Sequence, residues 1–114
     1  SLHCPQTAET AKLVNEDTLS LMKRSAILIN TARGGLIDEG ALAAALNEGR
    51  LAGAYLDVVS EEPVRPDNPL LRAKNCHLTP HVAWQPLETR RRLHKRVEEH
   101  LAAFLAGAPY DVVG

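Results

Sequence analysis

The chain has 114 residues, 45% of them hydrophobic and 24% charged, and its 13 basic and 14 acidic residues give a formal net charge of -1. Such a composition is typical of a soluble globular chain of single-domain size. The near-neutral balance offers no basic field for a phosphate backbone, so we expect no nucleic-acid partner. No apolar run approaches the length of a membrane-spanning helix, and residues 1–7 lack the pattern of a secretory signal. We therefore expect a cytoplasmic protein with no membrane partner.

The two cysteines, Cys4 and Cys76, lie far apart in the sequence and match no paired-cysteine metal spacing. Disulfide frameworks and zinc sites usually show several cysteines at short, regular intervals. Cysteine is also among the residues most often buried as a free thiol. We therefore expect two free, buried thiols and no metal site.

The first part of the chain alternates short apolar runs with a helix signal. Residues 2–5 form a short apolar piece that is stopped by proline, which indicates the end of a strand. Asn15 is suited to cap a helix that has two acids in its first turn and that ends near residues 23–25. The continuous apolar run at residues 26–29 predicts a parallel strand covered on both faces.

A second strand and helix follow the same plan. Gly34 and Gly35 break the first strand, and Asp38 is a good N-cap for a helix that Gly49 can close in the left-handed conformation. Residues 53–59 predict another buried strand.

The last part of the chain begins with a polar, proline-broken stretch at residues 60–69 and a short strand at residues 76–79. The longest helix is predicted over residues 88–106, and Gly107 and Pro109 end it. Its apolar positions fall on one face: Leu93, Val97, Leu101, Phe104 and Leu105.

Strands that alternate with helices predict a parallel sheet with right-handed crossovers, in which ligands lie beyond the carboxyl ends of the strands. The residues at those ends are Cys4, Pro5, Thr31, Ala32, Arg33, Asp57, Pro80 and His81. One edge of the sheet therefore collects most of the residues that could carry chemistry.

Two of these residues allow a ligand role and a structural role. Arg33 follows a buried strand and precedes two glycines, so its guanidinium is placed to grip a carboxylate, or else to pair with Asp38. The glycine pair favours the ligand role, because it lets the backbone approach a ligand closely. Asp57 is placed to accept from a ligand amide or merely to cap a loop, and both alternatives stay open.

His81 stands at the mouth of a strand, where an imidazole can face a cleft. Imidazole titrates near neutral pH, and a carboxylate held against the ring would favour its charged form. Glu62 alone is typical of a solvated loop acid, but a Glu62–His81 pair would make a proton donor with a defined tautomer. Trp84 is placed either to wall a substrate pocket or to cover a helix end.

Other polar groups carry less signal. The basic cluster at residues 90–96 has acidic neighbours and no interleaved aromatic residues, so we interpret it as a solvated helical face. The Arg33-Gly34-Gly35 turn has neither the spacing of a P-loop nor that of a dinucleotide fingerprint. The remaining histidines are read as structural or solvated: His3, His77, His94 and His100.

Four segments, taken together and in this order, resemble the D-isomer-specific 2-hydroxyacid dehydrogenases. They are residues 2–10 (LHCPQTAET), 29–39 (INTARGGLIDE), 56–58 (LDV) followed by Glu62 and Pro63, and 79–84 (TPHVAW). The resemblance covers essentially the whole chain. Its last segment is most similar to the glycerate dehydrogenase, or hydroxypyruvate reductase, branch, and the transcriptional corepressors related to these enzymes share much of the pattern.

The resemblance implies an NAD(P)-dependent oxidoreductase that acts on a small 2-hydroxy or 2-oxo acid of the hydroxypyruvate or glyoxylate type. Arg33 would bind the substrate carboxylate and keto oxygen, His81 would contact the substrate and donate the proton, and Glu62 would keep His81 charged. Trp84 would border the substrate. NAD or NADP would be bound by residues at cofactor-lining positions of the family: Cys4, Pro5, Thr10, Thr31, Ala32, Asp57 and Ala83.

The sequence departs from the family pattern at the phosphate site, because the Gly-x-Gly-x-x-Gly turn and the acid for the ribose are absent. We therefore expect a partial Rossmann-type α/β fold: the second half of a doubly wound parallel sheet over residues 1–85, then a connecting helix and tail over residues 86–114. We expect this chain to be a fragment that is inactive by itself and forms a homodimer through the exposed strand edge or the long helix. The alternative function is an NAD-sensing, corepressor-type binding protein.

Overall fold

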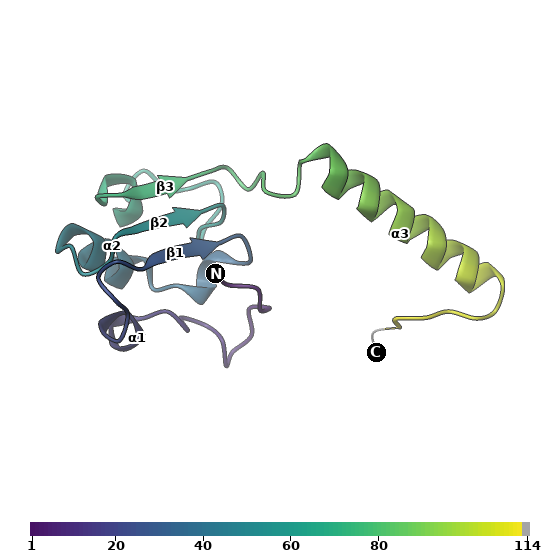
Figure 1. The fold of residues 1–114 in the computed structure, drawn as a ribbon, viewed down its shortest axis with the longest axis horizontal. Helices are drawn as coiled ribbons and strands as arrows, with labels where there is room; N and C mark the ends of the chain where they lie inside the picture. The colour runs from purple at the N-terminus through teal and green to yellow at the C-terminus, as the bar shows by residue number, and fades with distance from the viewer. Residues whose placement is uncertain (113–114) are drawn as a thin grey trace. The chain divides into compact units, whose positions relative to one another are not determined.

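The computed structural model describes residues 1–112, which divide into two compact units (Figure 1). The first unit is Ser1–Val82 and the second begins at Ala83. Each unit is described by itself below. The predicted division between residues 85 and 86 concerns the domains of the whole protein and stays a prediction.

Three parallel strands form the sheet in the described part of the first unit, in the order β1-β2-β3 (Figure 1). They are β1 (Ile27–Asn30), β2 (Gly53–Leu56) and β3 (Cys76–Leu78). Leu2 adds one parallel bridge to Asn30, so the predicted strand end at the start of the chain is present as a single bridge beside β1. Parallel strands joined by helical crossovers confirm the partial Rossmann-type α/β fold.

The helices of the first unit begin where their caps predict. Asn15 caps α1 (Glu16–Ser20) in a capping box with Thr18, because each side chain accepts a hydrogen bond from the other's backbone N–H. Asp38 caps α2 (Glu39–Asn47) by accepting from the backbone N–H of Ala41. Past the end of α2, Gly49 has a φ of 68°, the left-handed conformation predicted for it. Two short 3-10 helices, η1 (Gly34–Leu36) and η2 (Pro69–Arg72), complete the unit.

The hydrophobic core lies between the sheet and α1, α2 and η2. Strand and helix residues meet there at no more than 4% exposure: Leu19, Leu28, Leu42, Leu46, Ala54, Leu56 and Leu70. Apolar burial of this kind contributes roughly 1.5–3 kcal/mol for each large side chain. The core therefore anchors the strands whose carboxyl ends carry the polar residues.

The opposite face of the sheet is exposed in this structure, which corrects the prediction that the apolar strands are covered on both faces. Ile27, Ile29 and Tyr55 are 53%, 43% and 48% exposed, and the Tyr55 ring stacks on His77 with centroids 4.7 Å apart. The reason is that the crossovers through α1, α2 and η2 all contribute their apolar side chains to the same face.

The cysteines are free, as predicted, but Cys4 and Cys76 are only partly buried. Burial raises the pKa of the Cys76 thiol above its usual range. A raised pKa lowers the fraction of reactive thiolate at neutral pH.

The second unit contains α3 (Leu87–Leu105), which agrees with the predicted helix to within one residue at each end. None of its residues is fully buried, and Glu99 lies within 3.8 Å of Lys95 and 3.6 Å of Arg96. The basic cluster is thus part of a charged helical face. Among residues 1–112, no helix is both long and apolar enough to cross a membrane.

Candidate active site

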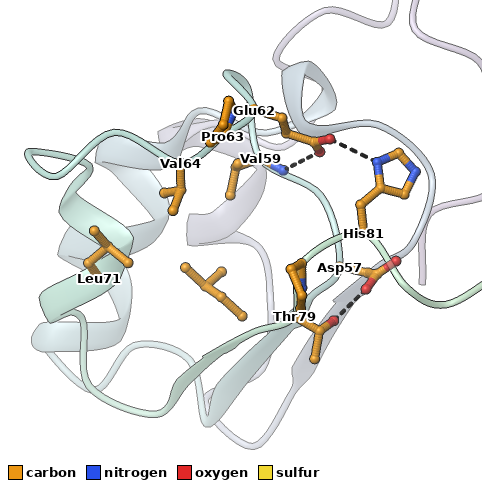
Figure 2. A pocket seen from close by; sticks show the side chains of 10 residues that line it. Asp57, Val59, Glu62, Pro63, Val64, Leu71, Thr79 and His81 are labelled. Carbon is orange, nitrogen blue, oxygen red and sulfur yellow. Dashed lines mark hydrogen bonds and ion pairs between the residues drawn. The ribbon is translucent and has the colours of Figure 1, made fainter.

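Asp57 follows β2 directly and is almost completely buried, at 5% exposure. Its carboxylate accepts hydrogen bonds from the Thr79 hydroxyl (Figure 2) and, at 2.9 Å, from the backbone N–H of Val82. Asp57 therefore caps the segment that follows β3, which is the loop-capping alternative of the sequence analysis. Its role toward a ligand amide stays a prediction.

The segment after β3 holds His81 in an unusual backbone conformation. His81 has a φ of 56°, in the left-handed region that non-glycine residues rarely adopt, and its backbone N–H donates to the Asp57 carbonyl at 2.9 Å. Such strained residues persist where the surrounding structure fixes them, and they cluster at functional sites. The backbone of Asp57, directly after β2, thus helps to fix the backbone of His81.

His81 and Glu62 form the predicted pair. The imidazole Nδ1 lies 2.8 Å from Glu62 Oε2, while Glu62 Oε1 accepts from the backbone N–H of Val59 at 3.3 Å (Figure 2). The hydrogen bond from His81, together with that from Val59, lowers the pKa of the Glu62 carboxyl below its usual range. A lowered pKa favours the ionised carboxylate as an acceptor for Nδ1, which leaves Nε2 as the nitrogen placed for proton transfer.

A pocket of about 480 Å³ adjoins this pair. Figure 2 shows apolar side chains on one side of it and the polar groups Asp57, Glu62, Thr79 and His81 on the other. The apolar part is made by Val59, Pro63, Val64, Leu71, Leu78 and Pro80. A mostly apolar pocket with a few convergent polar groups is the usual form of a small-molecule site.

Arg33 lies in a second pocket, also of about 480 Å³, at the ends of the Leu2 segment and β1. Its other lining residues are His3, Cys4, Pro5, Gln6 and Ala32. The guanidinium Nη1 donates to the Ala32 carbonyl at 2.6 Å, whereas Asp38 pairs with Lys12 at 3.0 Å. The Arg33–Asp38 pair considered above is therefore not formed.

The turn that carries Arg33 is locked by Asn30, whose side chain is fully buried. Asn30 donates to the Arg33 carbonyl at 2.8 Å and accepts from the Ala32 N–H at 2.9 Å. Next along the chain, Gly34 packs against the loop after β2, because a Cβ there would stand 1.9 Å from the Val59 carbonyl carbon. Only glycine fits such an approach, so Gly34 brings the Arg33 turn against the loop that carries Glu62.

The remaining predicted site residues are Thr10, Thr31, Ala83 and Trp84. Thr10 donates to the Pro5 carbonyl at 2.8 Å and so closes the turn between them. Thr31 is exposed at the end of β1. Ala83 and Trp84 belong to the second unit, and their roles stay predictions, as do the cofactor and substrate roles of every residue above.

Sequence reasoning missed Asn30, Thr79 and Glu39, whose side chains hydrogen-bond to the segments that carry the candidate site residues. A buried asparagine at the end of an apolar strand was the available signal for Asn30, because a buried amide must find partners. The contacts of Thr79 with Asp57 and of Glu39 with Ser60 join segments far apart in the chain, and no local pattern announces them.

The fold and the strand-end cluster are those of a Rossmann-type α/β domain, in which ligands lie beyond the strands. The NAD binding domain of the D-isomer specific 2-hydroxyacid dehydrogenases matches residues 1–83, and the chain belongs to this family. This confirms the resemblance found in the sequence.

Individual proteins similar to this chain agree with this family assignment. The chain is 50% identical over 113 residues to a hydroxypyruvate reductase of Blautia hydrogenotrophica, covering 99% of this chain and 35% of that protein. An acyclic imino acid reductase in complex with NADPH and D-Arg has a TM-score of 0.86 and 41% identity, over 99% of this chain and 36% of that one. The NAD complex of a D-isomer specific 2-hydroxyacid dehydrogenase from Lactobacillus delbrueckii ssp. bulgaricus has a TM-score of 0.82 and 31% identity, with 99% and 38% covered. The chain thus spans about a third of the length of the proteins it matches.

Proposed function

We propose that the protein carrying this chain uses NAD or NADP to interconvert a small 2-oxo acid, of the hydroxypyruvate or glyoxylate type, and its 2-hydroxy acid. The observation that carries the proposal is the 2.8 Å contact of Glu62 with His81 Nδ1 at the strand ends. Gly34 brings the turn bearing Arg33 against the Glu62 loop. A hydroxypyruvate reductase at 50% identity supports the substrate class.

In this proposal Arg33 binds the substrate carboxylate, because its planar fork of N–H donors matches two carboxylate oxygens. His81 donates a proton from Nε2 to the carbonyl oxygen as the carbonyl carbon is reduced, while Glu62 holds Nδ1 and stabilises the imidazolium. The nicotinamide, when bound, supplies the hydride, and the protein supplies orientation, charge and the proton. Trp84 is proposed to border the substrate.

The pocket beside Arg33 fits a nicotinamide cofactor, since it lies at the carboxyl ends of the parallel strands and has the small residues Cys4, Pro5 and Ala32 in its wall. We propose that Cys4, Pro5 and Ala32 contact the cofactor there. The residues proposed to complete its site are Thr10, Thr31, Asp57 and Ala83. Similar structures hold NADPH in one case and NAD in the other, and both remain candidates.

The proposed partners are the small acid substrate and a second copy of the protein. The exposed apolar residues on the open sheet face and on α3 support a homodimer, because uncovered apolar surfaces commonly pair in oligomers. A cytoplasmic location also stays a prediction.

The test is the oxidation of NADH and NADPH, followed at 340 nm, by the full-length product of the gene that encodes this chain. Hydroxypyruvate and glyoxylate are the substrates, and the 114-residue chain is assayed in parallel. We expect turnover by the full-length product alone. Saturable NADH binding with no turnover of either 2-oxo acid would contradict the enzymatic proposal and favour the NAD-sensing alternative.

A further inference from the structure

The carboxylate of Glu39, the first residue of α2, reaches across to the loop after β2. Glu39 Oε1 accepts from the backbone N–H of Ser60 at 2.7 Å, and Oε2 accepts from the Ser60 hydroxyl at 2.8 Å. The same Oε2 accepts from the side-chain amide of Asn68 at 2.9 Å. Three short hydrogen bonds on one carboxylate form a strong anchor, because bonds to a charged acceptor are roughly twice as strong as neutral ones.

These contacts hold both ends of the segment that carries Glu62. Ser60 precedes Glu62 by two residues, and Asn68 closes the segment. Asn68 is itself fixed, since its Oδ1 accepts from the backbone N–H of Leu70 at 2.9 Å at the start of η2. The loop is thus tied to α2 and η2, both of which pack in the core.

Gly34 also packs against the start of this loop at Val59, whereas the ion pairs of the loop do not attach it to its neighbours. Arg65 forms ion pairs with Asp67 at 3.0 Å and with Glu61 at 3.7 Å, but all three side chains are well exposed and belong to the loop itself. Exposed ion pairs contribute about 0–1 kcal/mol, and internal ones cannot tie a loop to its neighbours. Glu39, by contrast, is partly buried and bonds only to neutral donors among residues 1–112.

We propose that Glu39 is a positioning residue for the Glu62–His81 pair: it clamps Ser60 and Asn68 and thereby keeps the Glu62 carboxylate against His81 Nδ1. The catalytic consequence rests on the proposed function, whereas the positioning itself does not. Displacement of a catalytic group by about 1 Å can lower the rate by up to 100-fold, so a clamp remote from the reacting atoms still matters.

The experiment is an NMR titration of the Glu62 carboxyl in the 114-residue chain, labelled with 13C at the glutamate side chains. In wild type the His81 contact depresses the pKa of Glu62. Loss of the clamp in Glu39→Ala is expected to let the loop move, so that the Glu62 midpoint rises toward the ordinary value for glutamate. Glu39→Gln, which keeps one oxygen acceptor, is expected to lie between Glu39→Ala and wild type.

Glu48→Ala is the matched control, because Glu48 caps the other end of α2 and its carboxylate pairs with the partly buried Arg50 at 2.7 Å. Its Glu62 midpoint should equal that of wild type. An unchanged midpoint in folded Glu39→Ala would overturn the inference. Should Glu39→Ala not fold, Ser60→Ala and Asn68→Ala each remove one donor, and a wild-type midpoint in both would overturn it equally.

Kinetics of the full-length gene product give the second readout. We expect Glu39→Ala to lower kcat for the 2-oxo acid on the order of tenfold with little change in KM, and Glu39→Gln to recover part of the loss. The titration needs no substrate, so it tests the clamp even where the proposed reaction is not observed. A Glu62 midpoint that rises without any 2-oxo acid turnover in wild type would support the clamp and contradict the proposed function.

Discussion

The two strand-end pockets differ in how firmly their polar groups are held. Around His81, the ring contacts Glu62, the backbone N–H contacts Asp57, and the Asp57 carboxylate is held by Thr79 and Val82. Around Arg33, the turn is locked by Asn30, but the guanidinium itself bonds only to the adjacent Ala32 carbonyl among the contacts described.

The difference matches the two proposed tasks. A proton donor must have a defined tautomer and direction before substrate arrives, because proton transfer depends on geometry first. A guanidinium that binds a carboxylate can exchange one bond to its neighbouring carbonyl for two bonds to an oppositely charged ligand. The structure thus combines a firmly held imidazole with an adaptable guanidinium.

Removal of the His81 imidazole, the proposed proton donor, should have the largest effect on activity. His81→Ala in the full-length gene product is expected to lower kcat on the order of 1000-fold, because positioned general acids contribute roughly 10²–10⁴-fold. NADH binding, followed by fluorescence, should persist. His94→Ala, on the exposed face of α3, is the control and should leave kcat unchanged. Wild-type turnover in His81→Ala would remove the imidazole from the mechanism.

The second largest effect is expected from a variant that forces the two pockets apart. Gly34→Ala places a Cβ 1.9 Å from the Val59 carbonyl carbon, so the Arg33 turn and the Glu62 loop must move apart. We expect a loss of about 3 kcal/mol in the free energy of unfolding, measured by urea denaturation. Gly40→Ala in α2, where the nearest atom is Asp38 Oδ1 at 3.4 Å, should instead stabilise the chain by up to about 1 kcal/mol. Equal stabilities for the two variants would contradict the close approach.

The adaptable side chain is tested by Arg33→Ala. We expect KM for the 2-oxo acid to rise roughly 100-fold, since about 3 kcal/mol is the upper range for a hydrogen bond to a charged group. The midpoint of thermal unfolding should stay within a degree or two of wild type, because within residues 1–112 the guanidinium bonds only to its neighbouring carbonyl. A large loss of stability with unchanged KM would assign Arg33 a structural role.

The smallest effect is the acid dependence of stability. The Glu62 pKa is lower in the folded chain than in the unfolded one, so its contribution is fully present above the unfolded pKa and is lost as pH falls through the folded pKa. The gap in unfolding free energy between wild type and Glu62→Gln should therefore shrink on acidification. Asp38, whose pKa the Ala41 N–H and Lys12 also lower, is present in both chains and cancels. A gap that widens in acid would contradict the assigned cause.

Sequence patterns predicted where the helices begin, because helix caps are local, but α1 ends at Ser20 and β2 at Leu56, earlier than predicted. Asn15, Asp38 and Gly49 have the roles that their positions indicate, and the helix over residues 88–106 is displaced by one residue. The Glu62–His81 pair, which the family resemblance implied, is also present.

The rest depends on distant contacts. Lys12 takes the partner considered for Arg33, although it lies 26 residues from Asp38. An apolar run predicts burial but does not say which face is covered, so the exposure of Ile27 and Ile29 could not be foreseen. Glu39 is typical of a first-turn acid until Ser60 and Asn68 are brought against it.

The left-handed backbone of His81 sets stability against activity. Histidine in this conformation carries strain on the order of 1 kcal/mol, which glycine does not. His81→Gly would relieve the backbone while removing the proposed proton donor and its bond to Glu62. The backbone conformation at this position thus favours glycine, whereas the proposed reaction requires histidine. Such opposition is the expected signature of a site optimised for chemistry at some expense to the fold.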